Sequence, residues 1–452
     1  MIAIAREPLL PRPIRAVALF VAALLALPAV LLRAAELPAF QVTSREVFVP
    51  TTKTGLYIKA FAYYTQPTGG AMTSVYLYQT RSDTFDAAFV RESTDHGRTW
   101  TEPQKRVALE RTPEGVWRTG YRPGFVDPAS GRLLVFGGRT LLKNDNPLEA
   151  MRSGAVAYRL SGDGGQTFYD ERTVIQAGGD FDREHPLPGV TRGKNATQIG
   201  DLGSVPIRIR TGEILVPLQI TPLGADGEYT NPGGGYTYHD SAVLIGKWTD
   251  SGLITWQLSQ RVVGDPKLST RGLLEPTILA APDGRILMVM RGSNDSKGKL
   301  PGRRWYAISA DNGRTWTKPA PWGYTTGELF FSPSSCSRLI EHSSGRLLWI
   351  GNITPTNPKA NSPRYPLVVG VVDPVSLQLV KESLFTIDDR QPEDAAWMTL
   401  SNFYTYEDRE TREIVLHYSA IGRKHPFGKA DVAHDWTADA LRVRLAVEAA
   451  GK

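Results

Sequence analysis

Short β-rich runs, each opened by a turn, recur along the chain and indicate the fold class. A turn that contains glycine precedes such a run at Gly131 (SGRLLVFGG), Gly212 (TGEILVPLQ), Gly284 (DGRILMVMR) and Gly345 (SGRLLWIGN). A version without glycine stands at Thr411 (ETREIVLHYS), and a candidate first copy is Gly69-Gly70, which leads into residues 74–78. Runs of this length between turn residues are typical of strands, and no segment has sustained helical periodicity. The pattern predicts an all-β protein built from repeated hairpins.

The spacing of these hairpins predicts the architecture. About six copies lie roughly 60 to 80 residues apart, which is longer than a minimal blade and suits blades that carry loops. We therefore expect a six-bladed β-propeller with four-stranded antiparallel blades. Closure of such a ring leaves only short, protected edges and gathers loops from several blades around a central axis, where a ligand can bind. No linker interrupts the repeats, so residues 36–452 are expected to form a single domain.

A second repeat supports the same fold. The pattern Ser-x-Asp-x-Gly-x-Thr-Trp/Phe occurs at residues 93–100 (STDHGRTW), 161–168 (SGDGGQTF) and 309–316 (SADNGRTW), with a worn copy at 249–256. In such a turn the aspartate accepts hydrogen bonds from the backbone, the glycine adopts a left-handed conformation and the aromatic ring packs on the hairpin. We interpret these turns as structural and expect no catalytic role for Asp95, Asp163 or Asp311.

These turns resemble the Asp boxes of the BNR repeat in the sialidase (neuraminidase) superfamily. The resemblance extends from about Val47 to Ser419. It implies the six-bladed propeller already expected from the repeats. It also implies an active site in which three arginines bind a substrate carboxylate, an aspartate is the general acid/base, and a tyrosine assisted by a glutamate is the nucleophile.

The first segment predicts export. Arg6, Arg12 and Arg15 precede the apolar stretch 16–32, which is followed by small residues at Ala34 and Ala35. This order is typical of a signal peptide, so residues 1–35 are expected to direct the protein to the periplasm or the outside of the cell. The alternative is an uncleaved N-terminal anchor. We expect no membrane span in the mature domain, because the rest of the chain has no second apolar run of that length.

Charge and composition narrow the class of ligand. The formal net charge is +6, but lysines and arginines are scattered rather than clustered, which argues against a nucleic-acid partner. An anionic small ligand bound by a few arginines suits this balance better. Cys336 is the only cysteine, so the chain has no internal disulfide. No close His/Cys/carboxylate group has metal-ligand spacing, and we expect neither a catalytic metal nor another cofactor, in a protein that acts as a monomer.

The resemblance assigns candidate residues in the second half of the chain. Glu275 (LLEPTILAAPDGRILMVMR) occupies the place of the family glutamate, and Arg291, which closes the same hairpin, matches the second carboxylate-binding arginine. Arg364 stands where the third arginine lies. The alternatives are an exposed rim charge for Glu275 and a solvated loop arginine for Arg364.

The first repeat offers the remaining charged candidates. Arg81 and Asp86 (YQTRSDTFDAAFVRES) resemble the segment that carries an extra site arginine and the acid/base aspartate, and Asp83 competes with Asp86 for that role. The family's first carboxylate-binding arginine is replaced here by Lys59, in Tyr57-Ile58-Lys59-Ala60. Lysine keeps the charge but loses the two parallel hydrogen bonds of a guanidinium.

The nucleophile departs from the family pattern. The last repeat normally opens with a Tyr-Ser pair, whereas this chain has residues 397–404 (WMTLSNFY). Tyr404 is the nearest tyrosine and Tyr406 the next, and either one can instead pack within a strand. His239, Asp240, Tyr236 and Tyr238, which follow Gly233–Gly235, are expected to face the axis.

Two functions of different class follow. The first is an exo-acting, retaining glycoside hydrolase that removes a terminal acidic sugar, sialic acid or a similar one, from a glycan. Asp86 then protonates the leaving oxygen, and a tyrosine paired with Glu275 supplies the nucleophile. The second is a propeller without turnover that binds carbohydrate or mediates adhesion, which Lys59 and the missing Tyr-Ser pair favour.

Overall fold

The computed structural model describes residues 37, 39–294, 299–427 and 435–448. The predicted leader lies outside these residues. The described chain is nearly all β and forms six small antiparallel sheets, as the repeats predicted; four of the sheets have the four strands expected and two have five. Among the described residues, no helix has both the length and the apolar character that a membrane crossing requires.

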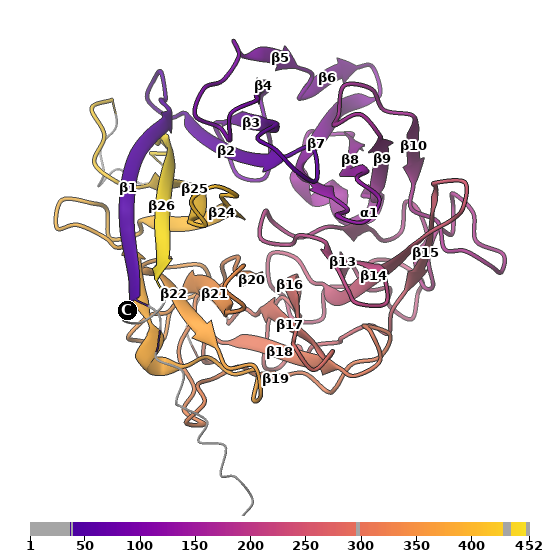
Figure 1. Cartoon of the computed structure of the whole chain (residues 1–452). Coiled ribbons are helices and arrows are strands. Elements are labelled where there is room, and N and C mark those ends of the chain that lie inside the picture. The colour runs from indigo at the N-terminus through magenta and orange to yellow at the C-terminus, as the bar shows by residue number, and fades with distance from the viewer. Residues whose placement is uncertain (1–36, 38, 295–298, 428–434, 449–452) are drawn as a thin grey trace, which may run out of the picture. The chain divides into compact units, whose positions relative to one another are not determined.

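Figure 1 shows the six sheets as blades around a common axis, numbered here in chain order. Blade 1 comprises β2 (Tyr57–Tyr64), β3 (Met72–Gln79), β4 (Ala87–Ser93) and β5 (Gln104–Arg106). Blade 2 comprises β6 (Leu109–Thr112), β7 (Gly115–Val126), β8 (Leu133–Leu142), β9 (Ala157–Ser161) and β10 (Asp170–Thr173). Blade 3 comprises β11 (Thr197–Gln198), β12 (Ile207–Arg208), β13 (Ile214–Ile220), β14 (Asp240–Trp248) and β15 (Ile254–Leu258).

The other three blades each have four strands. Blade 4 comprises β16 (Leu274–Ala280), β17 (Ile286–Arg291), β18 (Arg304–Ser309) and β19 (Ala320–Pro321). Blade 5 comprises β20 (Arg338–Glu341), β21 (Leu347–Asn352), β22 (Leu367–Val372) and β23 (Phe385–Asp388). Blade 6 comprises β24 (Thr399–Glu407), β25 (Ile414–Ile421), β26 (Ala440–Glu448) and β1 (Ala39–Val49). In the described part of the chain, three short helical segments lie between strands: η1 (Pro147–Glu149), α1 (Ala150–Ser153) and η2 (Lys381–Ser383).

The ring is closed by pairing the two ends of the chain. In blade 6 the strand order is β1-β26-β25-β24, so the first strand of the described chain forms the outer edge of the sheet that contains the last three. β1 runs antiparallel to β26 from Ala39↔Glu448 to Val49↔Ala440. This pairing removes two free strand edges, which would otherwise expose unpaired backbone groups.

The hydrophobic core lies between neighbouring blades. One cluster joins blade 5 to blade 6 through Leu348, Ile350, Leu400 and Leu416, and another joins blade 2 to blade 3 through Phe136, Leu218 and Trp256. Further clusters join blades 3 to 4, 4 to 5 and 1 to 2. Because each sheet packs both of its faces against other sheets, its strands carry continuous apolar runs, which is what made them visible in the sequence.

The repeated glycines stand at the turns that lead into β8, β13, β17 and β21. Gly131, Gly212, Gly284 and Gly345 have φ between +71° and +92°, a conformation that most residues avoid. In the copy without glycine, Arg412 adopts the same conformation at φ +63°. The turn geometry is therefore preserved in that repeat despite the change of residue.

The three Asp boxes are the turns that connect β4 to β5, β9 to β10 and β18 to β19. In the box of blade 2, the Asp163 carboxylate accepts hydrogen bonds from the Thr167 Oγ1 (2.6 Å), the Thr167 backbone N–H (2.9 Å) and the Ser161 Oγ (2.7 Å). These bonds lower the pKa of Asp163 to about 2. The carboxylate is fully occupied in holding the turn, in agreement with the structural role predicted for it.

Candidate active site

Three inner strands carry a β-bulge, and each bulge presents a polar residue near the axis. The pairing register shifts between Tyr121 and Gly124 in β7, between Leu274 and Thr277 in β16, and between Ser401 and Tyr404 in β24. The residues at these bulges are Arg122, Glu275 and Asn402. Glu275 and Asn402 both have positive φ, +47° and +59°. A bulge redirects one side chain out of the regular alternation, and such features concentrate next to active sites.

Glu275 and Arg291 form the central ion pair. Glu275 Oε1 lies 2.6 Å from Arg291 Nη1, and both side chains are largely buried, with exposed fractions of 14% and 8%. Arg291 Nε also donates to Ser334 Oγ at 2.8 Å. The second carboxylate oxygen of Glu275 is buried and has no hydrogen-bond partner among the described residues. A buried acceptor without a partner is costly, so this oxygen is an unsatisfied acceptor at the centre of the group.

Arg364 joins this pair from the loop between β21 and β22. Its Nε and Nη2 donate to the Ser334 carbonyl oxygen at 3.2 and 2.8 Å, and its Nη1 lies 3.5 Å from Asn402 Oδ1. Burial and the nearby charge of Arg291 lower the pKa of Arg364 to about 10. The structure therefore brings together Glu275, Arg291 and Arg364, three of the residues that the family resemblance singled out.

Lys59 lies at the start of blade 1 and is engaged by Asp201. Its Nζ is 2.7 Å from Asp201 Oδ1, and the exposed fractions of the two side chains are 10% and 11%. Burial alone would raise the pKa of Asp201, but the charges of Lys59 and Arg122 lower it. The charge of Asp201 in turn acts on Arg291 and Arg364, so the ion pair lies close to both arginines.

A glycine-flanked loop carries Asp201 into the centre. A Cβ at Gly200 would lie 2.6 Å from the Glu275 Cα, and a Cβ at Gly203 would lie 2.1 Å from the Ser337 carbonyl oxygen. Only glycine permits these approaches, which place the loop against β16 and against the segment before β20. The sequence IGDLGS was not recognised as a site segment, although two glycines around one aspartate were the available signal.

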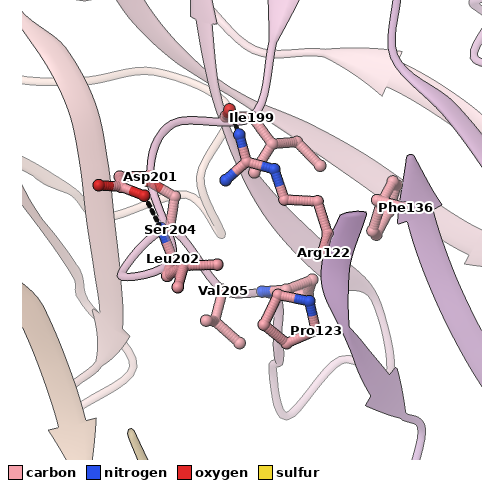
Figure 2. A pocket seen from close by; sticks show the side chains of 9 residues that line it. Arg122, Pro123, Phe136, Ile199, Asp201, Leu202, Ser204 and Val205 are labelled. Carbon is pink, nitrogen blue, oxygen red and sulfur yellow. Dashed lines mark hydrogen bonds between the residues drawn. The ribbon is translucent and has the colours of Figure 1, made fainter. Parts of the chain in front are cut away.

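Arg122 stands beside this loop at a small pocket between blades 2 and 3 (Figure 2). Figure 2 shows its guanidinium directed at the Ile199 carbonyl oxygen, to which Nη2 donates at 2.7 Å. The charge of Arg122 also interacts with Asp201 and Glu275. The remaining lining of the pocket is mostly apolar and includes Phe136, Leu202 and Val205. Sequence reasoning missed Arg122 because the bulge that presents it leaves no mark in the repeat pattern.

Removal of the charge at Lys59 is expected to destabilise the fold. Lys59→Met leaves the buried Asp201 carboxylate without its closest cation, and breaking a buried pair from one side typically costs about 3–5 kcal/mol. Without Lys59, burial dominates and the pKa of Asp201 rises. The loss in the free energy of unfolding, relative to the wild type, is therefore largest near neutral pH. It shrinks as the pH falls and Asp201 becomes protonated.

Urea unfolding of the variant and the wild type, near neutral pH and at about pH 4.5, measures this effect. The control is the double variant Lys59→Met/Asp201→Asn, which removes both charges and is expected to recover much of the loss. A single variant as stable as the wild type at neutral pH would mean that Arg122 alone compensates Asp201.

The two candidate acids, Asp83 and Asp86, lie in the loop between β3 and β4 of blade 1, here called the first-blade loop, and they make different contacts. Asp86 Oδ2 accepts hydrogen bonds from the Thr80 N–H (3.1 Å) and the Thr80 Oγ1 (2.7 Å), and Oδ1 faces Arg118 at 3.6 Å. Asp83 has φ +60°, and its charge raises the pKa of both Tyr57 and Tyr236 in addition to the effect of burial. Asp86 thus holds the base of the loop, whereas Asp83 acts on residues that surround the site.

Arg81 is not brought to the central arginines. Its Nη2 lies 2.6 Å from Asp145 Oδ2 and its Nε donates to Thr84 Oγ1 at 3.2 Å. Asp145 also pairs with Arg118, and the Arg81 side chain is 47% exposed. Arg81 therefore joins the first-blade loop to the loop after β8, where Asp145 lies.

Tyr404 lies in the hydrophobic core. It is 5% exposed, belongs to the cluster that contains Tyr63 and Leu133, and packs edge-on against Phe61 at 6.1 Å. Burial raises the pKa of its hydroxyl to about 12. In the described structure its interactions are with these residues and with Arg338, not with Glu275. The bulge in β24 presents Asn402 to Arg364, and Tyr404 follows it as a core residue.

His239, which was singled out in the sequence, supports the strand that carries Glu275. His239 is buried, with Nε2 3.3 Å from Gln219 Nε2, and burial together with Arg271 and Arg291 lowers its pKa to about 3. The Gln219 Oε1 accepts from the Glu275 backbone N–H at 2.9 Å. A neutral His239 therefore supports the residue that positions the Glu275 backbone.

One group in the described part of the chain has the side chains of a metal site, namely His96, Asp408 and Glu410. It lies at the Asp-box turn of blade 1 and the turn between β24 and β25. Asp408 pairs with Arg444 at 3.0 Å, and Glu410 pairs with Arg98. Both carboxylates already have cationic partners, so we assign no metal to this group.

The comparisons with known proteins agree with this architecture. The structure resembles a mutant NanB sialidase from Streptococcus pneumoniae (13% identity, TM-score 0.56, covering 89% of this chain and 71% of that one). It also resembles an intramolecular trans-sialidase from Ruminococcus gnavus (13% identity, TM-score 0.54, covering 89% and 96%) and the alpha-L-arabinofuranosidase of Fusarium graminearum (12% identity, TM-score 0.50, covering 90% and 98%). At such identities the likeness shows the fold. No curated protein matches the chain.

The family is shown by the sequence itself. Residues 123–421 match a protein family described as "BNR repeat-like domain". This segment is well over half of the 452-residue chain. The match covers most of blades 2 to 6, including two of the three complete Asp boxes, Glu275 and both central arginines. Together with the six-bladed architecture, it confirms the resemblance found in the sequence: the chain belongs to the BNR repeat-like domain family and has a sialidase-like propeller fold.

Proposed function

We propose that the protein is an exo-acting glycoside hydrolase that removes a terminal acidic sugar from a glycan. The observation that carries this proposal is the arrangement of Arg291 and Arg364 around Glu275 at the inner strands. Two guanidinium groups next to each other, Arg291 buried and Arg364 half-buried, favour an anionic ligand because such a ligand relieves their mutual repulsion. The second carboxylate oxygen of Glu275 belongs to the same group and is a buried acceptor without a hydrogen-bond partner among the described residues.

The contacts favour Asp83 over Asp86 as the general acid. Asp86 is committed to Thr80 and Arg118, whereas Asp83 acts on Tyr57, Tyr236 and Arg271, which lie around the site. In the proposed reaction, Asp83 gives its proton to the leaving glycosidic oxygen as the bond to the anomeric carbon breaks. A water molecule attacks that carbon, and Glu275 Oε2 takes the proton of the water.

This scheme departs from the retaining mechanism that the family resemblance implied. That mechanism needs a tyrosine hydroxyl beside Glu275, and Tyr404 packs instead against Phe61. The position of Tyr404 also favours the second candidate function, a propeller that binds an acidic saccharide without turnover. The two functions share the arginines and differ in whether Glu275 and Asp83 perform proton transfer.

Hydrolysis assays on 4-methylumbelliferyl glycosides of sialic acid, glucuronic acid and L-arabinose test the proposal. We expect turnover of at least one acidic glycoside and none of the neutral arabinoside. Binding of the acidic sugars without turnover would support the second function. Turnover of the neutral glycoside alone would contradict the role of the arginines.

Asp83→Asn is expected to lower kcat by about 100-fold or more for a substrate with a poor leaving group, because positioned proton transfer contributes that much. The loss should be much smaller with a 4-nitrophenyl glycoside, whose leaving group needs no proton. Asp86→Asn is the matched control, since its amide oxygen can still accept both hydrogen bonds from Thr80. A large leaving-group dependence in Asp86→Asn, together with normal kinetics in Asp83→Asn, would return the acid role to Asp86.

A further inference from the structure

The positive charge around the site exceeds what one carboxylate would balance. Lys59 is paired with Asp201 and Arg291 with Glu275. Among the described residues, no carboxylate oxygen lies within 4.0 Å of the guanidinium nitrogens of Arg364 or Arg271. The acceptors of Arg364 are the Ser334 carbonyl and the Asn402 amide oxygen, both neutral. Two guanidinium groups at the site therefore lack a directly paired anion.

Arg271 is built into the loop between β15 and β16. Its Nη2 donates to Thr237 Oγ1 at 2.5 Å, its carbonyl oxygen accepts from the His239 N–H at 3.2 Å, and its Nε is buried without a partner. Burial and the charge of Arg291 lower its pKa to about 9, an effect that Glu275 and Asp83 only partly oppose. An arginine that is held in place by neutral groups and has no carboxylate partner among the described residues favours an anionic ligand.

Tyr236 covers Arg271 and is open to solvent. The Arg271 guanidinium lies 5.7 Å from the centre of the Tyr236 ring, and Tyr236 is 54% exposed. A Cβ at Gly235 would lie 2.6 Å from the Arg271 Cγ, so glycine there allows the loop to bring Tyr236 over the arginine. The exposed ring and the guanidinium below it offer an apolar face and a cationic group to the same ligand.

Arg271 is close to the central arginines but distinct from them. Its charge is repelled by both Arg291 and Arg364, which places all three within electrostatic reach of one another. It comes from the segment before β16, whereas Arg364 comes from the loop after β21. A single carboxylate held by Arg291 and Arg364 would leave the charge of Arg271 unpaired.

We propose that the site binds a dianionic saccharide, with the carboxylate of the terminal sugar at Arg291 and Arg364 and a second oxyanion at Arg271 beneath Tyr236. The inference rests on the proposed function for the first anion. The second oxyanion is a sulfate ester or carboxylate on the same saccharide. Two separated cationic groups then discriminate against monoanionic sugars.

Calorimetric titration with matched probes tests this inference. The probes are the methyl glycosides of sialic acid and glucuronic acid. Each is tested without sulfate and as a series of derivatives that carry one O-sulfate at a different hydroxyl. At least one sulfate ester is expected to bind about ten-fold or more tightly than its parent sugar, as one added charge-assisted contact predicts. Arg271→Gln should reduce this ratio to about one and change the affinity for the parent sugar by less than about three-fold. Arg271→Lys, which keeps the charge, should retain part of the ratio.

The control is Arg192→Gln, the same substitution at an exposed arginine of the loop before β11. If the parent sugars bind or are hydrolysed, and none of their sulfates binds more tightly, the second-anion inference alone is overturned. A preference for sulfate that survives in Arg271→Gln would also overturn it. Tight binding of a sulfated sugar without hydrolysis would contradict the hydrolase and support the dianionic site. No binding of any probe would overturn both.

Discussion

Glu275→Gln is expected to lower kcat for an acidic glycoside by at least about 100-fold, because glutamine cannot accept a proton from the attacking water. The substitution keeps an oxygen for the hydrogen bond with Arg291, so binding should change less than turnover. Azide, which needs no deprotonation before attack, should restore part of the rate and give a glycosyl azide. Steady-state kinetics with and without azide, together with identification of the product, measure both effects.

The matched control for this variant is Glu341→Gln, an exposed carboxylate of β20. It is expected to behave as the wild type. Loss of activity without azide rescue would leave Glu275 as a residue that orients Arg291 rather than one that moves a proton. Equal activity of Glu275→Gln and wild type would remove the proposed mechanism.

Arg364→Ala is expected to weaken the binding of an acidic sugar by about ten- to hundred-fold, because one charge-assisted contact is worth roughly 1.5–3 kcal/mol. Arg364→Lys should lie between the wild type and Arg364→Ala, since lysine keeps the charge and loses the planar fork. Titration calorimetry with a sialoside and a glucuronide measures the change. Binding of a neutral sugar should not improve in either variant.

Arg364→Ala could weaken binding by unfolding the protein as well as by removing a charge, and the two causes have to be distinguished. Arg364 holds the Ser334 carbonyl oxygen through two nitrogens, so thermal unfolding of each variant belongs with the titration. Arg183→Ala, at an exposed loop position, is the matched control. Acidic-sugar affinity that is unchanged in a folded Arg364→Ala variant would refute the anionic ligand while leaving the propeller assignment intact.

Part of the candidate site was visible in the sequence because it follows the repeat. Glu275 opens a first strand, Arg291 closes the second, and the Gly284 turn between them has the spacing of the other copies. Arg364 was found by its place between two strands of the next repeat. These residues could be assigned because the resemblance to the sialidase superfamily gives each of them a place relative to a recognisable hairpin.

Other parts depended on one-residue changes of register. The bulge between Ser401 and Tyr404 directs Asn402 toward Arg364 and leaves Tyr404 in the core. A single extra residue exchanges the two faces of a strand, and the hydrophobic pattern of a strand buried on both faces does not reveal it. The sequence therefore placed Tyr404 near the right strand end and could not tell which way its ring points.

The sequence by itself determined the all-β class, the number of blades and the structural role of the Asp boxes, because each depends on turn chemistry and apolar runs within a few residues of one another. Only the tertiary structure decided which charges share the site. Lys59 with Asp201, and Arg271 with Arg364, come from different blades that meet when the ring closes through β1 and β26. The tertiary structure also decided between the two candidate acids. Asp86 is held by Thr80 and Arg118, whereas the charge of Asp83 acts on Tyr236 of another blade. Contacts between residues far apart in the chain depend on the positions of all six sheets, and no local pattern encodes them.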